Sequence, residues 1–300
     1  MLELGRVCVP VGLACNLNCK YCYRQCGKTR VPRLNNLMKR YLQQLTPDVS
    51  RVVSLSGGEP LLYLDRVKEI FDYTPPSIYK KVMTNGLLLT QEIVDWCNKE
   101  HIEVHVSHDG ALTKFLRGVD VFENPKIVDL VKQIQILRIH SVICAGNEDV
   151  CANYRYICDK IGRSDFYYTA SPVWGLETDE LVKGFNYNLY QRSFFEYQLK
   201  IRRTLDYYKI GHTCSNGLNV LPDGTVCSLV TMDIYGTVEN TIEEILAKKR
   251  ELGGFDACEK INCSVRDKCG YCSQTATPHL CKCLKINVNV NEYLSNNRYE

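Results

Sequence analysis

The sequence has no long apolar segment and no strong excess of charge. No run of about 18 apolar residues is present, so no transmembrane helix is expected. The chain does not open with a basic stretch followed by an apolar one, which is the pattern of a secretory signal. A net charge of +3 over 300 residues is too small to indicate a nucleic-acid partner. We therefore expect a cytoplasmic protein that binds neither a membrane nor a nucleic acid.

Cysteine, by contrast, is abundant, with 17 residues in the chain. In an exported protein this number would indicate disulfides, but no export signal is present and many of the cysteines fall at spacings typical of metal ligands. Hydrophobic residues make up 45% of the chain, which is enough for a sizeable core. The composition therefore favours a reducing compartment and bound metal.

Three cysteines, Cys15, Cys19 and Cys22, lie within eight residues. A loop of this length can bind one face of a four-iron cluster, each sulfur on its own iron, and leave the fourth iron open for a substrate or cofactor. An electron carrier instead caps every iron. Structural zinc sites use four ligands, usually in two close pairs, whereas the nearest further thiol here is Cys26, which suits a buried role as well as ligation. The spacing therefore favours a cluster with an open iron.

A second motif, Ser56-Gly57-Gly58-Glu59-Pro60, follows about one strand and one helix later. Together the two motifs resemble the signature of the radical S-adenosylmethionine (radical SAM) enzymes. The resemblance implies that the open iron chelates the amino and carboxylate groups of SAM. It also implies that an electron from the cluster cleaves SAM to methionine and a 5′-deoxyadenosyl radical, with flavodoxin or ferredoxin as the external electron donor.

Short apolar runs alternate with helical patterns over the first half of the chain. The runs predict strands at 7–13, 51–55, 79–83, 102–106, 139–145 and 166–169, separated by helices at 34–45, 62–73, 91–100, 126–136 and 150–161. This alternation predicts an α/β fold with a parallel sheet and helices outside. Six units fall short of a closed eight-unit barrel, and the family resemblance implies the same partial (β/α)6 barrel. Chemistry in such barrels lies at the carboxyl ends of the strands, where the cysteine loop, Gly57–Pro60, Asn85 and Ser107–Asp109 fall.

The second half of the chain begins with an aromatic-rich stretch at 185–208, which predicts one long helix bridging two domains. Eight cysteines follow, at Cys214, Cys227, Cys258, Cys263, Cys269, Cys272, Cys281 and Cys283. Their run resembles the SPASM extension of radical SAM peptide-modifying enzymes, in which seven cysteines hold two auxiliary four-iron clusters. We therefore expect a barrel at 1–185, a bridging helix at 186–210 and an auxiliary-cluster domain at 211–300.

The C-terminal spacing departs from the SPASM pattern in three places. Gly224 and Cys227 are separated by two residues rather than four, Cys258 and Cys263 by four rather than two, and Cys269 and Cys272 by two rather than three. Carried over by position, the resemblance implies an inner cluster on Cys214, Cys227 and Cys272 and an outer one on Cys258, Cys263, Cys269 and either Cys281 or Cys283. Two clusters, a single cluster and a zinc knuckle all remain open.

Several further residues receive roles from the resemblance. Tyr21 would contact the adenine of SAM, and the backbone of Gly57, Gly58, Glu59 and Pro60 would meet its methionyl amine. Asn85 and Ser107 would lie beside the cofactor, Ser107 near its ribose or carboxylate. Arg117 would contact SAM or the adjoining loop.

Two residues have alternative interpretations. Asp109 is either a proton acceptor for a substrate that loses hydrogen and an electron, or a turn residue before Gly110. Cys144 is either a small buried residue or a thiol that returns a hydrogen atom to a substrate radical.

The function that best fits these features is hydrogen abstraction from a carbon of a peptide or protein, in the manner of ribosomal-peptide maturation. The auxiliary clusters would accept the resulting electron or bind the substrate. Because the barrel begins almost at Met1, either a separate protein presents a leader peptide or no leader is needed. Alternatives in the same class are oxidation of a serine or cysteine to formylglycine and action on a small molecule. A non-catalytic iron–sulfur carrier or a zinc-stabilised interaction module is the alternative from another class.

Overall fold

The computed structural model describes residues 6–22, 36–47, 50, 52–172, 181, 183–197, 218–221, 223–228 and 234–252. Its centre is a run of parallel strands in chain order, namely β1 (Val7–Gly12), β2 (Val52–Gly57), β3 (Tyr79–Thr84), β4 (Glu103–Ser107), β5 (Leu137–Ile143) and β6 (Tyr167–Pro172). Each strand pairs in parallel with the next. The prediction of an α/β fold with a parallel sheet is confirmed.

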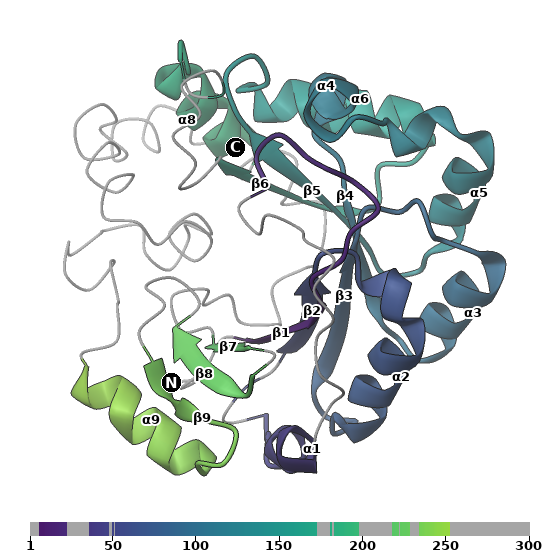
Figure 1. Cartoon of the computed structure of the whole chain (residues 1–300). Helices are drawn as coiled ribbons and strands as arrows, with labels where there is room; N and C mark the ends of the chain where they lie inside the picture. The colour runs from purple at the N-terminus through teal and green to yellow at the C-terminus, as the bar shows by residue number, and fades with distance from the viewer. Residues whose placement is uncertain are drawn as a thin grey trace, which may run out of the picture.

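Helices follow the strands and cover one face of the curved sheet. They are α1 (Asn36–Gln43), α2 (Leu64–Tyr73), α3 (Gln91–Lys99), α5 (Pro125–Gln133) and α6 (Val150–Ile161). Figure 1 shows α2, α3, α5 and α6 along the outer face. Buried residues such as Leu55 and Val104 from the strands and Ile70 and Val94 from the helices belong to one apolar core. No helix among the described residues is long and apolar enough to cross a membrane.

The sequence patterns missed several short elements. These are the helix α4 (Thr113–Arg117) and the 3-10 turns η1 (Pro60–Tyr63), η2 (Gly110–Leu112) and η3 (Val121–Glu123). All of them follow the carboxyl ends of strands. They are too short to show a hydrophobic period, which is why pattern alone did not predict them.

Three further strands extend the sheet beyond β1. They are β7 (Leu218–Val220), parallel to β1, and the antiparallel pair β8 (Thr225–Ser228) and β9 (Ile234–Thr237), after which α9 (Ile242–Glu251) follows. Asp223 and Gly224 lie in the turn that joins β7 to β8, and Gly224 has a φ of +86°, which glycine adopts readily. The strand β9 was not predicted. Figure 1 shows this group beside the β1 edge.

The predicted bridging helix begins as α8 (Tyr187–Glu196), with Tyr190, Phe194 and Tyr197 buried in the core. The rest of that prediction lies outside the described residues. So do the predicted auxiliary ligands Cys214, Cys258, Cys263, Cys269, Cys272, Cys281 and Cys283. Their roles and the domain boundaries stay predictions.

The inner face of the sheet, opposite the helices, carries polar side chains. Strand register aligns Ser54 with Lys81 and Lys81 with Glu103, and it aligns His105 with Arg138. Aligned residues point to the same face of a sheet. A parallel sheet that is covered on both faces normally carries apolar residues on both, so this polar face calls for a chemical explanation.

Thr90 caps α3, because its hydroxyl accepts a hydrogen bond from the backbone N–H of Ile93 at 3.3 Å. We expect Thr90→Ala to lower the free energy of unfolding by about 1 kcal/mol, since one helix N–H loses its partner. Urea denaturation measures this change. The matched control is Thr46→Ala, at an exposed position in the turn after α1, and an equal loss in both variants would contradict the capping role.

Candidate active site

The cysteine loop leaves the sheet at the carboxyl end of β1. Cys15, Cys19 and Cys22 are all partly exposed, and the Cys22 N–H donates to the Cys19 carbonyl at 3.0 Å. The Cys15 sulfur accepts from the Leu17 N–H at 3.4 Å and faces the Asn85 amide at 3.9 Å. Burial raises the pKa of Cys15 and of Cys19.

Within the described part of the chain, no three His, Cys, Asp or Glu side chains converge closely enough to hold one metal ion. In a four-iron cluster each thiolate binds a separate iron, so the three sulfurs need not meet around one point.

The segment Gly57-Gly58 lies directly against the cysteine loop. The Gly58 N–H donates to the Gly12 carbonyl and the Glu59 N–H to the Ala14 carbonyl, both at 2.8 Å. A Cβ atom on Gly57 would lie 2.2 Å from the Gly12 oxygen, and one on Gly58 would lie 2.1 Å from the Ala14 oxygen. Only glycine permits this backbone approach, which explains the Gly-Gly of the motif in physical terms.

Glu59 is buried and its carboxylate is already engaged. It accepts hydrogen bonds from the Leu61 N–H at 3.0 Å, the Thr84 hydroxyl at 2.7 Å and the Asn85 N–H at 2.7 Å. Burial raises the pKa of Glu59, although these three donors oppose the shift. Asn85 in turn donates from its side chain to Asn16 at 2.7 Å. Glu59 therefore ties the end of β3 to the cysteine loop, as expected of a residue with no chelating duty of its own.

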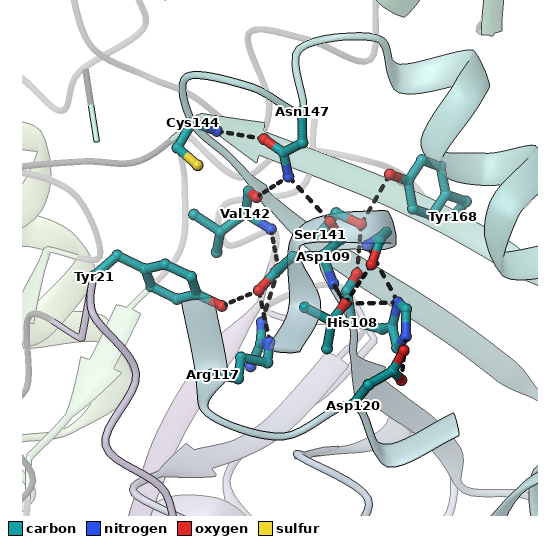
Figure 2. Close-up of polar contacts among 12 residues, drawn as sticks. Tyr21, His108, Asp109, Arg117, Asp120, Ser141, Val142, Cys144, Asn147 and Tyr168 are labelled. Carbon is teal, nitrogen blue, oxygen red and sulfur yellow. Dashed lines mark hydrogen bonds and ion pairs between the residues drawn. The ribbon is translucent and has the colours of Figure 1, made fainter. Parts of the chain in front are cut away.

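Asp109 is the centre of a second network, drawn in Figure 2. Its buried carboxylate receives Arg117 Nε at 2.7 Å and Nη2 at 3.0 Å, the Tyr21 hydroxyl at 2.6 Å and the Val142 N–H at 2.8 Å. Burial alone would lower the pKa of Arg117, but the Asp109 charge outweighs it and raises that pKa above its ordinary value. The network joins the cysteine loop, α4 and β5.

The geometry bears on both interpretations of Asp109. Two carboxylate oxygens offer about four acceptor positions, and four donors reach them. The carboxylate is therefore already engaged within the protein, and its role as a proton acceptor stays a prediction. The turn interpretation is incomplete, because the side chain makes no hydrogen bond to cap the following turn η2.

Tyr21 lies in the cysteine loop, and Arg117, at the end of α4, lies beside it. The guanidinium of Arg117 stands 5.3 Å from the centre of the Tyr21 ring. Their contacts with SAM stay predictions, as does that of Ser107, which ends β4 and pairs in register with His140. Pro60 is buried at the first position of η1.

Cys144 lies one residue beyond β5, not on the strand as predicted. Its buried side chain belongs to a small cluster with Leu116 and Leu181, against which Tyr21 packs. Its N–H donates to the Asn147 side chain at 2.7 Å, and burial raises the pKa of its thiol to about 11. Both interpretations of Cys144 fit this position. Cys227 is buried on β8 and aligned with Asn219 and Cys8 across the sheet.

A buried histidine that the sequence analysis missed fixes the turn that carries Asp109. His108 faces Asp120 at 2.9 Å and Thr113 at 3.1 Å, and the Thr113 hydroxyl accepts the Asp109 N–H at 2.8 Å (Figure 2). The run His108-Asp109-Gly110 followed by Thr113 and Asp120 was the available signal.

The family comparison bears on the segment just described. Residues 9–134 match the family model of the radical SAM superfamily. This segment carries the features of a radical SAM superfamily domain. The matched segment includes the cysteine loop, Gly57–Pro60, Asn85 and Asp109, and a domain of this superfamily is expected to use SAM and a four-iron cluster.

Three curated relatives resemble parts of the chain. An uncharacterised protein of Methanocaldococcus jannaschii is 27% identical over 43% of this chain and 46% of its own length. The AdoMet-dependent heme synthase of Methanosarcina barkeri is 36% identical over 32% of this chain and 29% of its own length. A serine-type anaerobic sulfatase-maturating enzyme of Klebsiella pneumoniae is 33% identical over 31% of this chain and 26% of its own length. The chain spans less than half the length of each.

Solved structures share the fold over more of the chain. The anSMEcpe protein with bound AdoMet and the Cp18Cys peptide has a TM-score of 0.63 at 16% identity, covering 88% of each chain. Streptococcus suis SuiB bound to the precursor peptide SuiA has a TM-score of 0.58 at 14% identity, covering 80% of this chain and 64% of its own. These likenesses establish the barrel fold.

We expect the loss of the buried Asp109–Arg117 ion pair to lower the free energy of unfolding far more than the loss of an exposed ion pair. Asp109→Asn leaves the buried Arg117 charge without its partner and should lower the free energy of unfolding by about 3–5 kcal/mol. The double variant Asp109→Asn/Arg117→Gln should cost less than the sum of its parts, because no charge is left stranded. Denaturant unfolding of the double-mutant cycle measures the coupling.

The matched control lies in the same part of the chain. Lys114 and Glu123 form an exposed pair at 2.8 Å, and Glu123→Gln should change stability far less, since water screens that pair. A loss in Asp109→Asn no larger than in this control would contradict the proposed importance of the network.

Proposed function

We propose that this chain is a radical SAM enzyme that acts on a peptide or protein. The observation that carries the proposal is the three-thiol loop at the end of β1, held against the Gly57-Gly58 backbone at the edge of the sheet where α/β enzymes bind their ligands. Cys15, Cys19 and Cys22 would hold a four-iron cluster with one open iron. When SAM is bound, the cluster supplies the electron that yields methionine and a 5′-deoxyadenosyl radical, which takes a hydrogen atom from a substrate carbon.

The chain's own residues would position SAM. The backbone of Gly57–Pro60 is the seat for its methionyl amine, with Asn85 beside it. Arg117 is already charge-paired with Asp109, so its contribution is to hold Tyr21 at the position expected for the adenine. Ser107 ends the next strand and would face the ribose or carboxylate.

Peptides bound to anSMEcpe and SuiB support a peptide substrate, since both share this barrel. Similarity to a sulfatase-maturating enzyme supports oxidation of a side chain to formylglycine as one version of that chemistry. Similarity to the heme synthase supports a second candidate, a radical SAM reaction on a small molecule. Auxiliary clusters on the C-terminal cysteines, a flavodoxin or ferredoxin donor, a separate leader-binding protein and a cytoplasmic location belong to the first proposal.

The test uses anaerobically purified protein reconstituted with iron and sulfide. With SAM and dithionite we expect 5′-deoxyadenosine by mass spectrometry, and we expect it to fall to the protein-free level in Cys15→Ala, Cys19→Ala and Cys22→Ala. Cys158→Ala, a half-buried cysteine on α6, is the matched control and should keep the activity. Formation of 5′-deoxyadenosine in all three ligand variants would overturn the cluster assignment.

The same assay separates the two substrate classes. Candidate peptides deuterated at carbon should transfer deuterium into 5′-deoxyadenosine if the substrate is a peptide. Transfer only from a deuterated porphyrin or another small molecule would favour the second candidate.

A further inference from the structure

The inner face of the barrel holds a buried charged layer below the strand ends. Arg138 on β5 donates to Glu103 on β4 through Nε at 2.5 Å and Nη2 at 3.1 Å. Lys81 on β3 lies 3.6 Å from the same carboxylate, and the Tyr79 hydroxyl donates to it at 3.2 Å. Neither the cysteine loop nor the Asp109 network contacts this layer through any of these bonds.

Among the described residues, the side chains of this layer carry more positive than negative charge. Lys81 and Arg138 both lie against the carboxylate of Glu103. Burial alone would raise the pKa of Glu103, but Arg138 and Lys81 outweigh it and bring that pKa to about 2, so the carboxylate is charged. Burial lowers the pKa of Lys81 to about 8, which still leaves it mostly protonated at neutral pH. These three side chains together therefore carry one more positive than negative charge.

His105 stands two residues along β4 from Glu103 and has no hydrogen bond. Its side chain is 4% exposed, and neither ring nitrogen has a partner among the residues the structure describes. The ring meets that of His140 edge-on, with centroids 5.2 Å apart, and His140 is itself bonded to Ser171 at 3.1 Å. Burial and the nearby Lys81 keep the pKa of His105 well below its ordinary value, so the ring is neutral and offers one N–H donor and one acceptor.

A second unpartnered group belongs to the same face. The Ser54 hydroxyl is fully buried on β2 and, within the described residues, makes no hydrogen bond. Its strand aligns it with Lys81. Buried polar groups in native proteins are almost always paired, so two orphaned groups near the Lys81 ammonium indicate a missing partner.

We propose that His105 and Lys81 bind a carboxylate group of the substrate on the inner face of the barrel. A carboxylate accepts hydrogen bonds only, which matches the N–H of His105, the ammonium of Lys81 and the hydroxyl of Ser54. Its charge balances the excess positive charge of the layer. The inference deepens the proposed function and rests on it for the identity of the ligand as substrate.

The site's depth constrains where the reaction occurs on the substrate. His105 lies two residues before Ser107 on β4, a separation of roughly 7 Å along a strand. Ser107 is at the level of the cysteine loop and the Gly57–Pro60 segment. The carbon that loses hydrogen therefore lies a few bonds from the carboxylate, toward the strand ends.

A peptide offers this group either as its C-terminal carboxylate or as an aspartate or glutamate side chain. Two small probes distinguish these sources. N-acetylglycine presents a C-terminal carboxylate, and the C-terminal amide of N-acetylaspartate presents only the side-chain one. Formate serves as the minimal probe for the site itself.

The test is NMR of the cluster-loaded protein with carbon-13 in its histidine rings. The chain has six histidines, and His105→Gln identifies the His105 signal by its loss. We expect formate to shift that signal saturably at constant ionic strength set with chloride, while exposed His101 does not move. The formate concentration that gives half of the maximal shift should rise at least tenfold in Lys81→Met. It should remain unchanged in the control Lys80→Met, because Lys80 is the preceding residue on the same strand.

Other outcomes overturn the proposal. No saturable shift of His105 with any of the three probes means that water alone satisfies these groups. Equal formate affinity in wild type and Lys81→Met means that Lys81 is not a ligand. If Lys81→Met does not fold, Ser54→Ala and the wild-type titration still decide, because a carboxylate that binds must move the His105 signal.

The experiment is independent of SAM cleavage. Formate binding without any 5′-deoxyadenosine would preserve the anion site and refute the proposed reaction. Formation of 5′-deoxyadenosine without formate binding would preserve the reaction and refute the anion site.

Discussion

The buried carboxylate of Asp109 is the interaction on which the site geometry depends most. It is fully shielded from solvent and joins three segments that are far apart in the chain, through Tyr21, Arg117 and Val142. An ionised carboxylate is costly to bury without compensation, and here four donors compensate it. Because Arg117 would be left as an unpaired buried charge, the loop, the short helix α4 and the end of β5 cannot shift independently. The cysteine loop is thereby fixed relative to the sheet.

Glu59 is a second buried acid that anchors the cysteine loop. Its buried carboxylate gathers donors from η1 and from the end of β3, and Asn85 extends the contact to Asn16. The cysteine loop is thus anchored by two buried acids, one reached through Asn85 and one through Tyr21. Neither acid needs to touch a cofactor to matter, since a cluster site demands that three sulfurs keep a fixed spacing. Rigid support of ligands by neighbouring hydrogen bonds is a general requirement of metal sites.

Much of the fold could be predicted from the sequence, because its signals are local. The strand–helix alternation predicted six strands and their helices, and the bounds of α6 agree to the residue. The Gly57-Gly58 motif could be located in the same way. The reason why both positions need glycine could not be predicted, because the close approach to Gly12 and Ala14 is a tertiary contact.

The role of Asp109 could not be predicted, for a related reason. Its partner Tyr21 lies 88 residues away in the chain and Val142 lies 33 residues away. The local sequence contains only the following Gly110 as a signal, and that glycine indicates a turn. The polar inner face is more visible in the sequence. Glu103 and His105 on β4, and Arg138 and His140 on β5, alternate with apolar residues. Alternation of this kind in a parallel sheet covered by helices signals that one face serves something other than the core.

That asymmetry between the two faces is the strongest physical argument for a ligand inside the barrel. The outer face is an apolar core shared with the helices and supplies the folding free energy. The inner face could carry valine and isoleucine at the same positions with a gain in stability, because buried ion pairs are seldom better than well-packed apolar residues. Lys81, Glu103 and Arg138 therefore impose a cost that the outer face must offset. A histidine with two unpartnered nitrogens adds to that cost without contributing any bond of its own. Stability does not explain these residues, whereas a negatively charged ligand that accepts hydrogen bonds from the His105 N–H, Lys81 and Ser54 does.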